Sequence, residues 1–188
     1  MPLRADPCIG MLEFSSIAAG IEALDAMLKD APVRVVLARP VSPGKYLVLV
    51  TGDVDEVKSA VHAGRAGRLD ALVDELLLPN AHPALFEALA GRGNVGEIDA
   101  IGVIETVSAA AAVVAADLAV KQASVTLLDL RLANGLGGKG YLTLTGEVGD
   151  VEEAVRAGAA PAEAKGLLTR KVVIPRPHPD MVRELRTQ

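Results

Sequence analysis

Few side chains in this sequence could do chemistry, and their spacing argues against an enzyme. The three imidazoles are His62, His82 and His178, and none stands in a local pattern with a nucleophile. A catalytic site needs such a pair, or two carboxylates, on a rigid support. His82 and His178 each precede a proline, which favours a helix-capping or interface role for them over acid–base work. We therefore expect no catalytic residues.

The sequence also predicts no bound cofactor or metal. Cys8 is the single cysteine and cannot form an internal disulfide, which fits a reducing compartment. Cys/His spacing typical of zinc sites is absent from the sequence. Residues 135–140 have glycines spaced much as in a phosphate loop. They lack the Gly-Lys-Ser/Thr ending, and a β-type run follows in place of a helix, so nucleotide binding is only weakly indicated.

Two loops without bulky side chains stand at matching places in the chain. Residues 39–45 (RPVSPGK) and 132–140 (LANGLGGKG) each lie between two apolar, β-type runs. Such loops permit unusual backbone dihedrals and leave amide groups uncovered. This suits a place where several backbones crowd together, or where a small solute passes close to peptide dipoles. For either loop taken alone, a plain hairpin turn is the alternative.

Composition restricts the partners and the location. The 188 residues carry a net charge of −5, and no cluster of Lys and Arg is present, which argues against a nucleic-acid partner. The N-terminus lacks the apolar run of a signal peptide. The most apolar stretch, residues 109–120, is interrupted by Asp117 and is too short to cross a bilayer. We expect a cytoplasmic protein that does not bind membranes.

The chain also repeats itself. Residues 9–13 (IGMLE) reappear as 101–105 (IGVIE), and residues 79–83 (PNAHP) reappear as 175–179 (PRPHP). The shift grows from 92 to 96 positions along the chain, and two of the extra residues fall within the second loop. Agreement at several ordered landmarks indicates a tandem duplication. The predicted domains are residues 1–94 and 95–188.

Each half predicts the order strand, helix, strand, strand, helix, strand and short helix. Apolar β-type runs predict strands at residues 10–14, 33–37, 46–50 and 72–78 of the first half. This order defines an α/β fold: two tandem α/β sandwich domains of ferredoxin-like element order, each with helices on one sheet face.

Helix signals lie between these strands. Ser15 or Ser16 can cap the first helix, and Asp53 can cap the second, which Gly64 would end. His82-Pro83 would open the short last helix. The apolar residues at helical spacing are Ile17, Ile21, Leu24 and Leu28 in the first helix, and Val54, Val57 and Val61 as the buried stripe of the second.

Several of these segments resemble a known family. Residues 10–13 (GMLE), Leu28-Lys29, residues 52–54 (GDV) and residues 173–178 (VIPRPH) look like the shell-protein domain of bacterial microcompartments. Two such domains in one chain are similar to the trimer-forming, tandem-domain shell proteins of this family. Because the first strand comes first in both halves, the chain resembles the unpermuted subtype. The resemblance runs from about residue 8 to the C-terminus.

The resemblance implies a function for the two loops. It implies a structural shell protein, a homotrimer that mimics a hexamer, lying in a microcompartment shell within the cytoplasm beside hexameric and pentameric tiles. The loop between the second and third strands would line a central pore for small metabolites. By position, the pore-lining residues would be Ser42, Pro43, Gly44, Lys45, Asn134, Gly135, Leu136, Gly137, Gly138 and Lys139. The two lysines could add positive charge at the pore rim and favour anionic or polar solutes, unless both point to solvent.

The resemblance also implies which residues lie at the edge of the tile. Lys29 and Lys121 match the edge lysine of the family, and Arg176 matches its edge arginine. Asn80 replaces that arginine in the first half, and His82 and His178 lie on the same edge segments. Some trimeric relatives hold an iron–sulfur cluster through a pore-loop cysteine. Neither loop has a cysteine here, so no cofactor is expected.

Two other classes of protein remain open. A ring-forming small-molecule-binding or sensor protein of ferredoxin-like type would share the duplication, but it should hold one ligand tightly in a closed pocket. A small enzyme is the other, and the missing acid–base constellation argues against it.

Overall fold

The computed structural model describes residues 8–91 and 98–185. The chain divides into two compact units, one made of residues 1–81 with 133–138 and the other of residues 82–132 with 139–188. The predicted boundary between residues 94 and 95 lies outside the described residues and stays a prediction.

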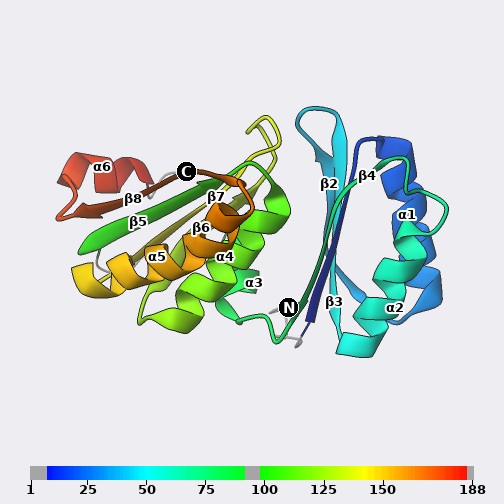
Figure 1. The fold of residues 1–188 in the computed structure, drawn as a ribbon, viewed down its shortest axis with the longest axis horizontal. Coiled ribbons are helices and arrows are strands. Elements are labelled where there is room, and N and C mark those ends of the chain that lie inside the picture. The colour runs from blue at the N-terminus through cyan, green and yellow to red at the C-terminus, as the bar shows by residue number, and fades with distance from the viewer. Residues whose placement is uncertain (1–7, 92–97, 186–188) are drawn as a thin grey trace. The chain divides into compact units, whose positions relative to one another are not determined.

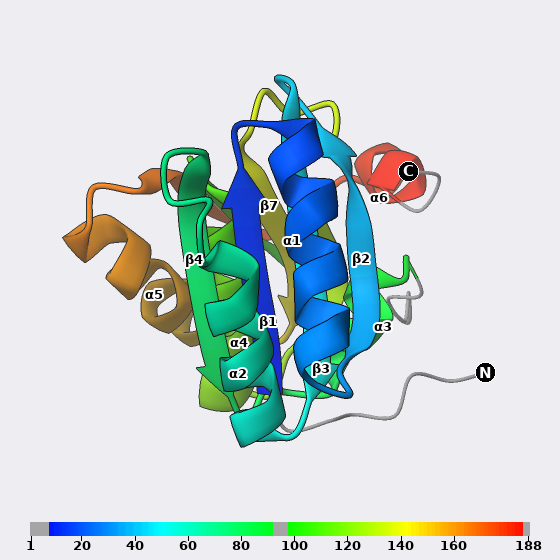
Figure 2. The same ribbon diagram turned by 90° about the vertical axis from the view of Figure 1, so that its right-hand side faces the viewer.

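The first unit is a four-stranded antiparallel sheet with two helices on one face. Its elements are β1 (Cys8–Phe14), α1 (Ile17–Asp30), β2 (Arg34–Val41), β3 (Lys45–Gly52), α2 (Val54–Arg65) and β4 (Leu72–Pro79). The strand order is β2-β3-β1-β4, so β1 lies between β3 and β4. Figure 2 shows α1 and α2 side by side in front of this sheet. The predicted element order and the single covered face are confirmed.

A glycine allows α1 to lie close to the sheet. Most of the apolar stripe expected on α1 is not buried: Ile17, Ile21 and Leu28 are exposed, and of the four residues only Leu24 packs against the core. The buried residues of α1 are Gly20, Ala23 and Met27. The reason is the close approach of α1 to β3. A Cβ at Gly20 would lie 2.5 Å from the Cβ of Tyr46, so a large side chain on this face would push the helix away.

The helix ends predicted from the sequence are confirmed only in part. Ser16 caps α1, and its Oγ accepts a hydrogen bond from the Ala19 N–H at 3.3 Å. Asp53 occupies the N-cap of α2 as predicted, but its side chain makes no capping bond. Gly64 does not end α2, which continues to Arg65. It is buried instead, and a Cβ there would lie 2.6 Å from Met27 Cγ, so this glycine allows α1 and α2 to pack closely.

The buried stripe of α2 is confirmed at two of its three positions. Val57 and Val61 lie in the core, together with Leu12, Phe14, Met27, Val48 and Val50, whereas Val54 is exposed. Val54 is the first residue of the helix, where the side chain lies at the rim of the helix pair.

The second unit repeats this architecture. Its sheet has the order β6-β7-β5-β8, and α4 and α5 cover one face (Figure 1). The elements are β5 (Ala100–Thr106), α4 (Ala109–Gln122), β6 (Thr126–Leu132), β7 (Gly140–Gly146), α5 (Val148–Ala164), β8 (Leu168–Pro175) and α6 (Pro179–Leu185). The short helix α3 (Ala84–Leu89), which follows β4 in the chain, belongs to this second unit and packs against β6 and α4.

Candidate functional site

The two loops singled out by the sequence connect neighbouring antiparallel strands. The first turns at Ser42, Pro43 and Gly44 between β2 and β3, with a cis Ser42–Pro43 peptide bond. The second spans residues 133–139 between β6 and β7. Gly44, Gly135, Gly137 and Gly138 have φ values of 81°, 72°, 62° and 90°. Residues with a side chain rarely adopt these dihedrals, which confirms why glycines recur in the loops.

The two loops contact each other. Residues 133–138 pack as part of the first unit, and the Gly135 N–H donates a hydrogen bond to Ser42 Oγ at 3.3 Å. A Cβ built on Gly138 would lie 3.5 Å from Lys45 Nζ and 3.6 Å from Pro43 Cδ. Segments more than 90 residues apart in the sequence therefore form one surface of small side chains and backbone amides.

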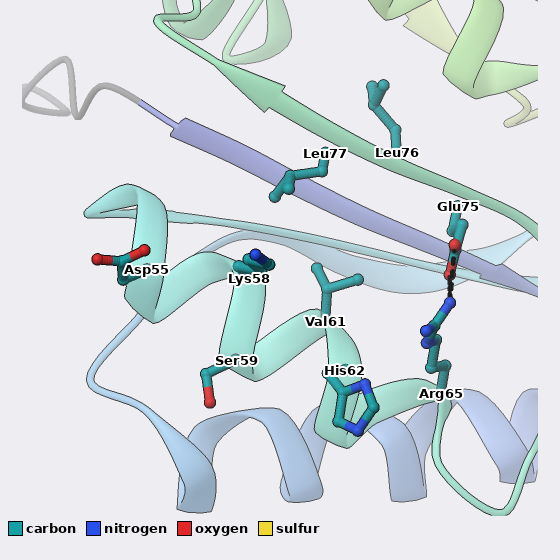
Figure 3. A pocket seen from close by; sticks show the side chains of 9 residues that line it. All are labelled: Asp55, Lys58, Ser59, Val61, His62, Arg65, Glu75, Leu76 and Leu77. Atoms are coloured by element: carbon teal, nitrogen blue, oxygen red, sulfur yellow. Dashed lines mark hydrogen bonds and ion pairs between the residues drawn. The ribbon is translucent and has the colours of Figure 1, made fainter.

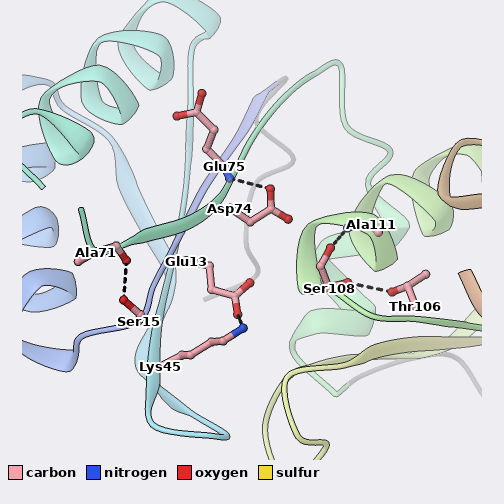
Figure 4. A network of polar contacts seen from close by, with 9 residues as sticks. All are labelled: Glu13, Ser15, Lys45, Ala71, Asp74, Glu75, Thr106, Ser108 and Ala111. Carbon is pink, nitrogen blue, oxygen red and sulfur yellow. Dashed lines mark hydrogen bonds and ion pairs between the residues drawn. The ribbon is translucent and has the colours of Figure 1, made fainter. Parts of the chain in front are cut away.

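The lysine that follows each loop is paired with a glutamate of its own sheet. Lys45 Nζ lies 3.0 Å from Glu13 Oε1, and Lys139 Nζ lies 2.7 Å from Glu105 Oε1. Figure 4 shows Lys45 reaching across to Glu13 on β1. The side chain of Glu13 is only 1% exposed, whereas that of Glu105 is 34% exposed. Each glutamate offsets its lysine, so these side chains add less positive charge than the sequence alone indicated.

Sequence reasoning missed these ion pairs, although a signal was present. Glu13 and Lys45 have repeat-equivalents in Glu105 and Lys139. A pair of opposite charges preserved through an internal duplication indicates a contact.

The predicted edge residues fall into two different settings. Lys29 pairs with Asp25 on the exposed surface of α1 at 2.5 Å. The equivalent Lys121 pairs with Asp117 on α4 at 2.6 Å, but the Asp117 side chain is only 3% exposed. The backbone N–H of His82 donates to the other oxygen of Asp117 at 2.8 Å. The structure therefore brings His82 and Lys121 together through one carboxylate.

Asn80 and Arg176 have the same unusual backbone. Their φ values are 54° and 47°, in the left-handed region. Each follows the proline that ends a strand, so the chain leaves β4 and β8 in the same way. In each half the following histidine accepts a hydrogen bond through Nδ1, from Ala84 N–H to His82 and from Asp180 N–H to His178, both at 3.2 Å. His178, directly before α6, therefore caps that helix, whereas the N-cap of α3 is Pro83 and His82 bonds to the first residue of the helix from one position earlier.

Hydrogen bonds and burial shift the pKa values of several ionisable groups. The hydrogen bond from Arg131 Nε to Asp129, 2.6 Å long, raises the pKa of Arg131. Burial raises the pKa of Tyr141, and the negative charge of Asp129 adds to that rise. Burial also raises the pKa of the Cys8 thiol. Arg131 and Tyr141 lie opposite each other on β6 and β7, so both stay protonated near neutral pH on the strands that hold the second loop.

A groove of about 530 Å³ lies between α2 and β4 and was not predicted. Figure 3 shows the Arg65–Glu75 ion pair bridging its two walls. Ser59, on the helix side, donates a hydrogen bond to Asp30 at 2.6 Å, so its hydroxyl is already engaged and is not paired with His62. The lining residues are Asp55, Lys58, Ser59, Val61, His62, Arg65, Glu75, Leu76 and Leu77. The spacing of residues 55, 58, 59 and 62 on one helical face was the available signal.

Within the described residues, no group of three or more His, Cys, Asp or Glu side chains could hold a metal ion. None of the helices in residues 8–91 and 98–185 has the length and apolar character needed to span a bilayer.

Fold and loops together define a class: a protein of two tandem α/β domains whose strand-connecting loops are matched in position and touch each other. The BMC domain family matches this chain twice, over residues 8–81 and 100–177. The chain therefore belongs to the BMC domain family, and it is a structural protein of a bacterial microcompartment shell. The predicted family is confirmed, and the alternative of a small-molecule sensor is not supported.

Individual relatives agree with this assignment. The bacterial microcompartment shell protein PduT of Citrobacter freundii is 45% identical over 177 residues, which cover 94% of this chain and 96% of its own. The carboxysome assembly protein CcmO of Synechococcus elongatus is 32% identical over 194 residues, 94% of this chain and 68% of its own.

Solved structures agree as well. The crystal structure of a microcompartment protein from Desulfitobacterium hafniense matches with a TM-score of 0.90 and 47% identity, over 95% of this chain and 99% of that one. A fused, permuted hexameric shell protein matches with a TM-score of 0.60 and 24% identity, over 83% of each chain, and shows likeness of fold alone.

Proposed function

We propose that three copies of this chain close into a flat ring that mimics a hexamer, with both loops of every copy at a central pore. The observation that carries this proposal is the contact between the loops, in which the Gly135 N–H donates to Ser42 Oγ. A ring built from head-to-tail contacts needs one loop per domain at its axis, and small residues allow them to converge. The proposed lining is Ser42, Pro43, Gly44, Lys45, Asn134, Gly135, Leu136, Gly137, Gly138 and Lys139.

The solutes that fit such a pore are small and polar. Because the loops differ in length and sequence, the pore has threefold symmetry. Lys45 and Lys139 are each paired with a glutamate, so the selectivity comes mainly from backbone amides and the Ser42 hydroxyl, not from six unpaired positive charges. Such a lining favours polar or anionic metabolites over apolar ones.

Replacing Leu136 with tryptophan tests the pore. Leu136 is half-buried in the second loop, and three added indoles would narrow the opening. We expect Leu136→Trp to lower the permeability of assembled shells to a small polar solute by roughly tenfold, with an unchanged oligomer mass. Entry of the solute into purified shells is measured by rapid mixing. Leu69→Trp is the matched control, because Leu69 is 67% exposed in a loop outside the proposed lining. Equal permeability of the two variants would refute the pore assignment.

The partners in this proposal are two further copies and other shell tiles, hexameric and pentameric. We place Lys29, Lys121, Arg176 and Asn80 along the tile edges. His82 and His178 were predicted on the same edges, but the bond from His82 N–H to Asp117 within the chain favours a place for both histidines where one repeat meets the next. The domains are residues 1–94 and 95–188. The chain carries out no reaction, holds no cofactor, and binds neither nucleic acid nor membrane.

Removing both edge lysines tests the tiling. Lys29 makes only an exposed ion pair, with side chains 75% and 63% exposed, and such pairs contribute little stability. Lys121 pairs with the buried Asp117, which keeps its hydrogen bond from the His82 N–H when the lysine is removed. We expect the double variant Lys29→Ala, Lys121→Ala to keep a mass three times that of the 19.4 kDa chain while its two-dimensional sheets are lost. Native mass spectrometry and negative-stain electron microscopy report the two outcomes. Loss of the trimer itself would show that the edge assignment is wrong.

A further inference from the structure

The short helical segment that follows the fourth strand occurs in both halves of the repeat. Among the described residues it is buried against neighbouring elements in only one of its two copies. After β4, residues 82–89 contain His82 and helix α3; after β8, residues 178–185 contain His178 and helix α6. The two segments are equivalent under the internal repeat, and both begin with the same histidine hydrogen bond at 3.2 Å. Their surroundings differ: Leu85, Phe86 and Ala88 of α3 are buried, and α6 has no buried residue.

The second unit shows what this segment binds. Helix α3 packs against β6 and α4. On β6, the side chains of Leu127 and Leu130 are each 3% exposed. On α4, Asp117 accepts from His82 N–H at 2.8 Å through one oxygen and from Lys121 through the other. The binding surface thus combines an apolar strand with one carboxylate that receives a backbone N–H.

The first unit carries the same surface, and none of the described residues covers it. Asp25 is the equivalent of Asp117, and its side chain is 63% exposed instead of 3%. Val35 is the equivalent of Leu127, and it is 40% exposed instead of 3%. Ile21 is the equivalent of Val113, and it is 54% exposed instead of 0%. We call the surface formed by Ile21, Asp25, Leu28 and Val35 the α1–β2 surface. Exposed aliphatic side chains grouped in this way mark an interaction site.

Segment 178–185 has the chemistry to fill it. Met181, Val182 and Leu185 are half-buried apolar side chains on α6, at the positions of Leu85, Phe86 and Leu89 on α3. His178 stands at the position of His82, whose N–H serves as donor in the second unit. Both partners of the interaction seen in the second unit are therefore present, one on each unit.

We infer that the α1–β2 surface binds residues 178–185 of a second copy of this chain, as α4 and β6 bind residues 82–89 within one chain. The contact joins two different surfaces, so it is head-to-tail, and repeated contacts of this kind close into a ring. This inference rests on the proposed trimer and names the residues that hold it together: His178 N–H donates to Asp25, and α6 covers Val35 and Ile21 of the next copy.

Cross-linking of paired cysteines tests the contact in the full chain. We expect the double variant Asp25→Cys, His178→Cys, treated with a short bis-maleimide, to give covalent dimers and trimers on a denaturing gel. The matched control is the double variant Asp117→Cys, His82→Cys, which should cross-link within one chain and migrate as a monomer. Cys8 is fully buried and common to both variants. Each single variant should give no ladder.

The outcomes separate two failures. If the unmodified chain is a monomer by native mass, the proposed trimer fails and the inference fails with it. If it is a trimer and only the control pair cross-links, the trimer holds and this contact is wrong. A cross-link between residues 25 and 178 within one chain would also overturn the inference.

A second variant tests the contact without new cysteines. Val182→Asp places a carboxylate on the apolar side of α6, where the contact would leave it without water. We expect association to weaken by about 100-fold or more, so that the trimer dissociates at micromolar concentration. Arg183→Ala changes the net charge by the same amount at an exposed position of α6 and should leave the trimer intact. A Val182→Asp protein that stays trimeric on the same dilution series would contradict the inference.

Discussion

Replacing Lys45 with methionine should destabilise the protein by about 3–5 kcal/mol, because the change leaves a buried charge without its partner. The Glu13 side chain is 1% exposed and accepts from Lys45 Nζ at 3.0 Å. Its second oxygen, Oε2, is buried and has no hydrogen-bond partner among the described residues. Lys45 therefore provides most of the compensation for burying this carboxylate. Urea denaturation followed by circular dichroism measures the loss.

The internal repeat supplies the control for Lys45→Met. Lys139→Met removes the equivalent lysine, but Glu105 is 34% exposed and Lys139 is 47% exposed, so water solvates the remaining carboxylate. We expect this variant to lose less than about 1 kcal/mol. Adding Glu13→Gln to Lys45→Met should recover part of the lost stability, since no buried charge remains. Equal losses in the two lysine variants would show that burial of Glu13 does not govern the effect.

Replacing Gly158 with valine should cost about 3 kcal/mol of stability in the second unit. A Cβ at Gly158 would lie 2.6 Å from the carbonyl oxygen of Ala115 and 3.1 Å from the Cβ of Ala119. Both atoms are fixed by helix α4, so α4 and α5 would have to separate. Thermal unfolding and urea denaturation measure the change.

Gly149 is the control for Gly158→Val. Gly149 is in the first turn of α5, and nothing lies within 4 Å of a Cβ built there. Gly149→Ala should leave stability unchanged or raise it by up to about 1 kcal/mol, because alanine favours the helix. A Gly158→Val protein as stable as Gly149→Ala would mean that the two helices are not packed as closely as described.

The duplication made most of the fold predictable. Strand positions, the order of elements and the equivalence of the two halves follow from runs such as residues 46–50 and from the repeated landmarks. The Ser16 cap of α1 and the position of α3 after His82-Pro83 follow from local rules. These features depend on residues close together in the chain, which a sequence shows directly.

The face of α1 could not be predicted in the same way. Ile17, Ile21 and Leu28 have the spacing of a buried stripe, but Gly20, Ala23 and Met27 are the residues that contact the sheet. A sequence pattern identifies an apolar face without saying what covers it. Ile17, Ile21 and Leu28 are therefore exposed, and Gly20 allows α1 to lie close to β3.

Only part of the candidate site could be predicted. The small residues of the loops indicated a crowded or solute-contacting place, but the bond between Gly135 and Ser42 joins the two halves of the repeat and has no local signal. The different burial of Asp25 and Asp117 was also hidden, because the two residues look equivalent in the sequence. Residues 82–89 cover Asp117 in the second unit, whereas Asp25 is 63% exposed among the described residues.

The most direct test of the central claim is an electron cryo-microscopy map of the purified chain under assembly conditions. We expect a ring of three copies in which residues 42–44 and 134–138 of every copy surround the threefold axis. A map with these loops on the outer perimeter, or with no ring at all, would contradict the account.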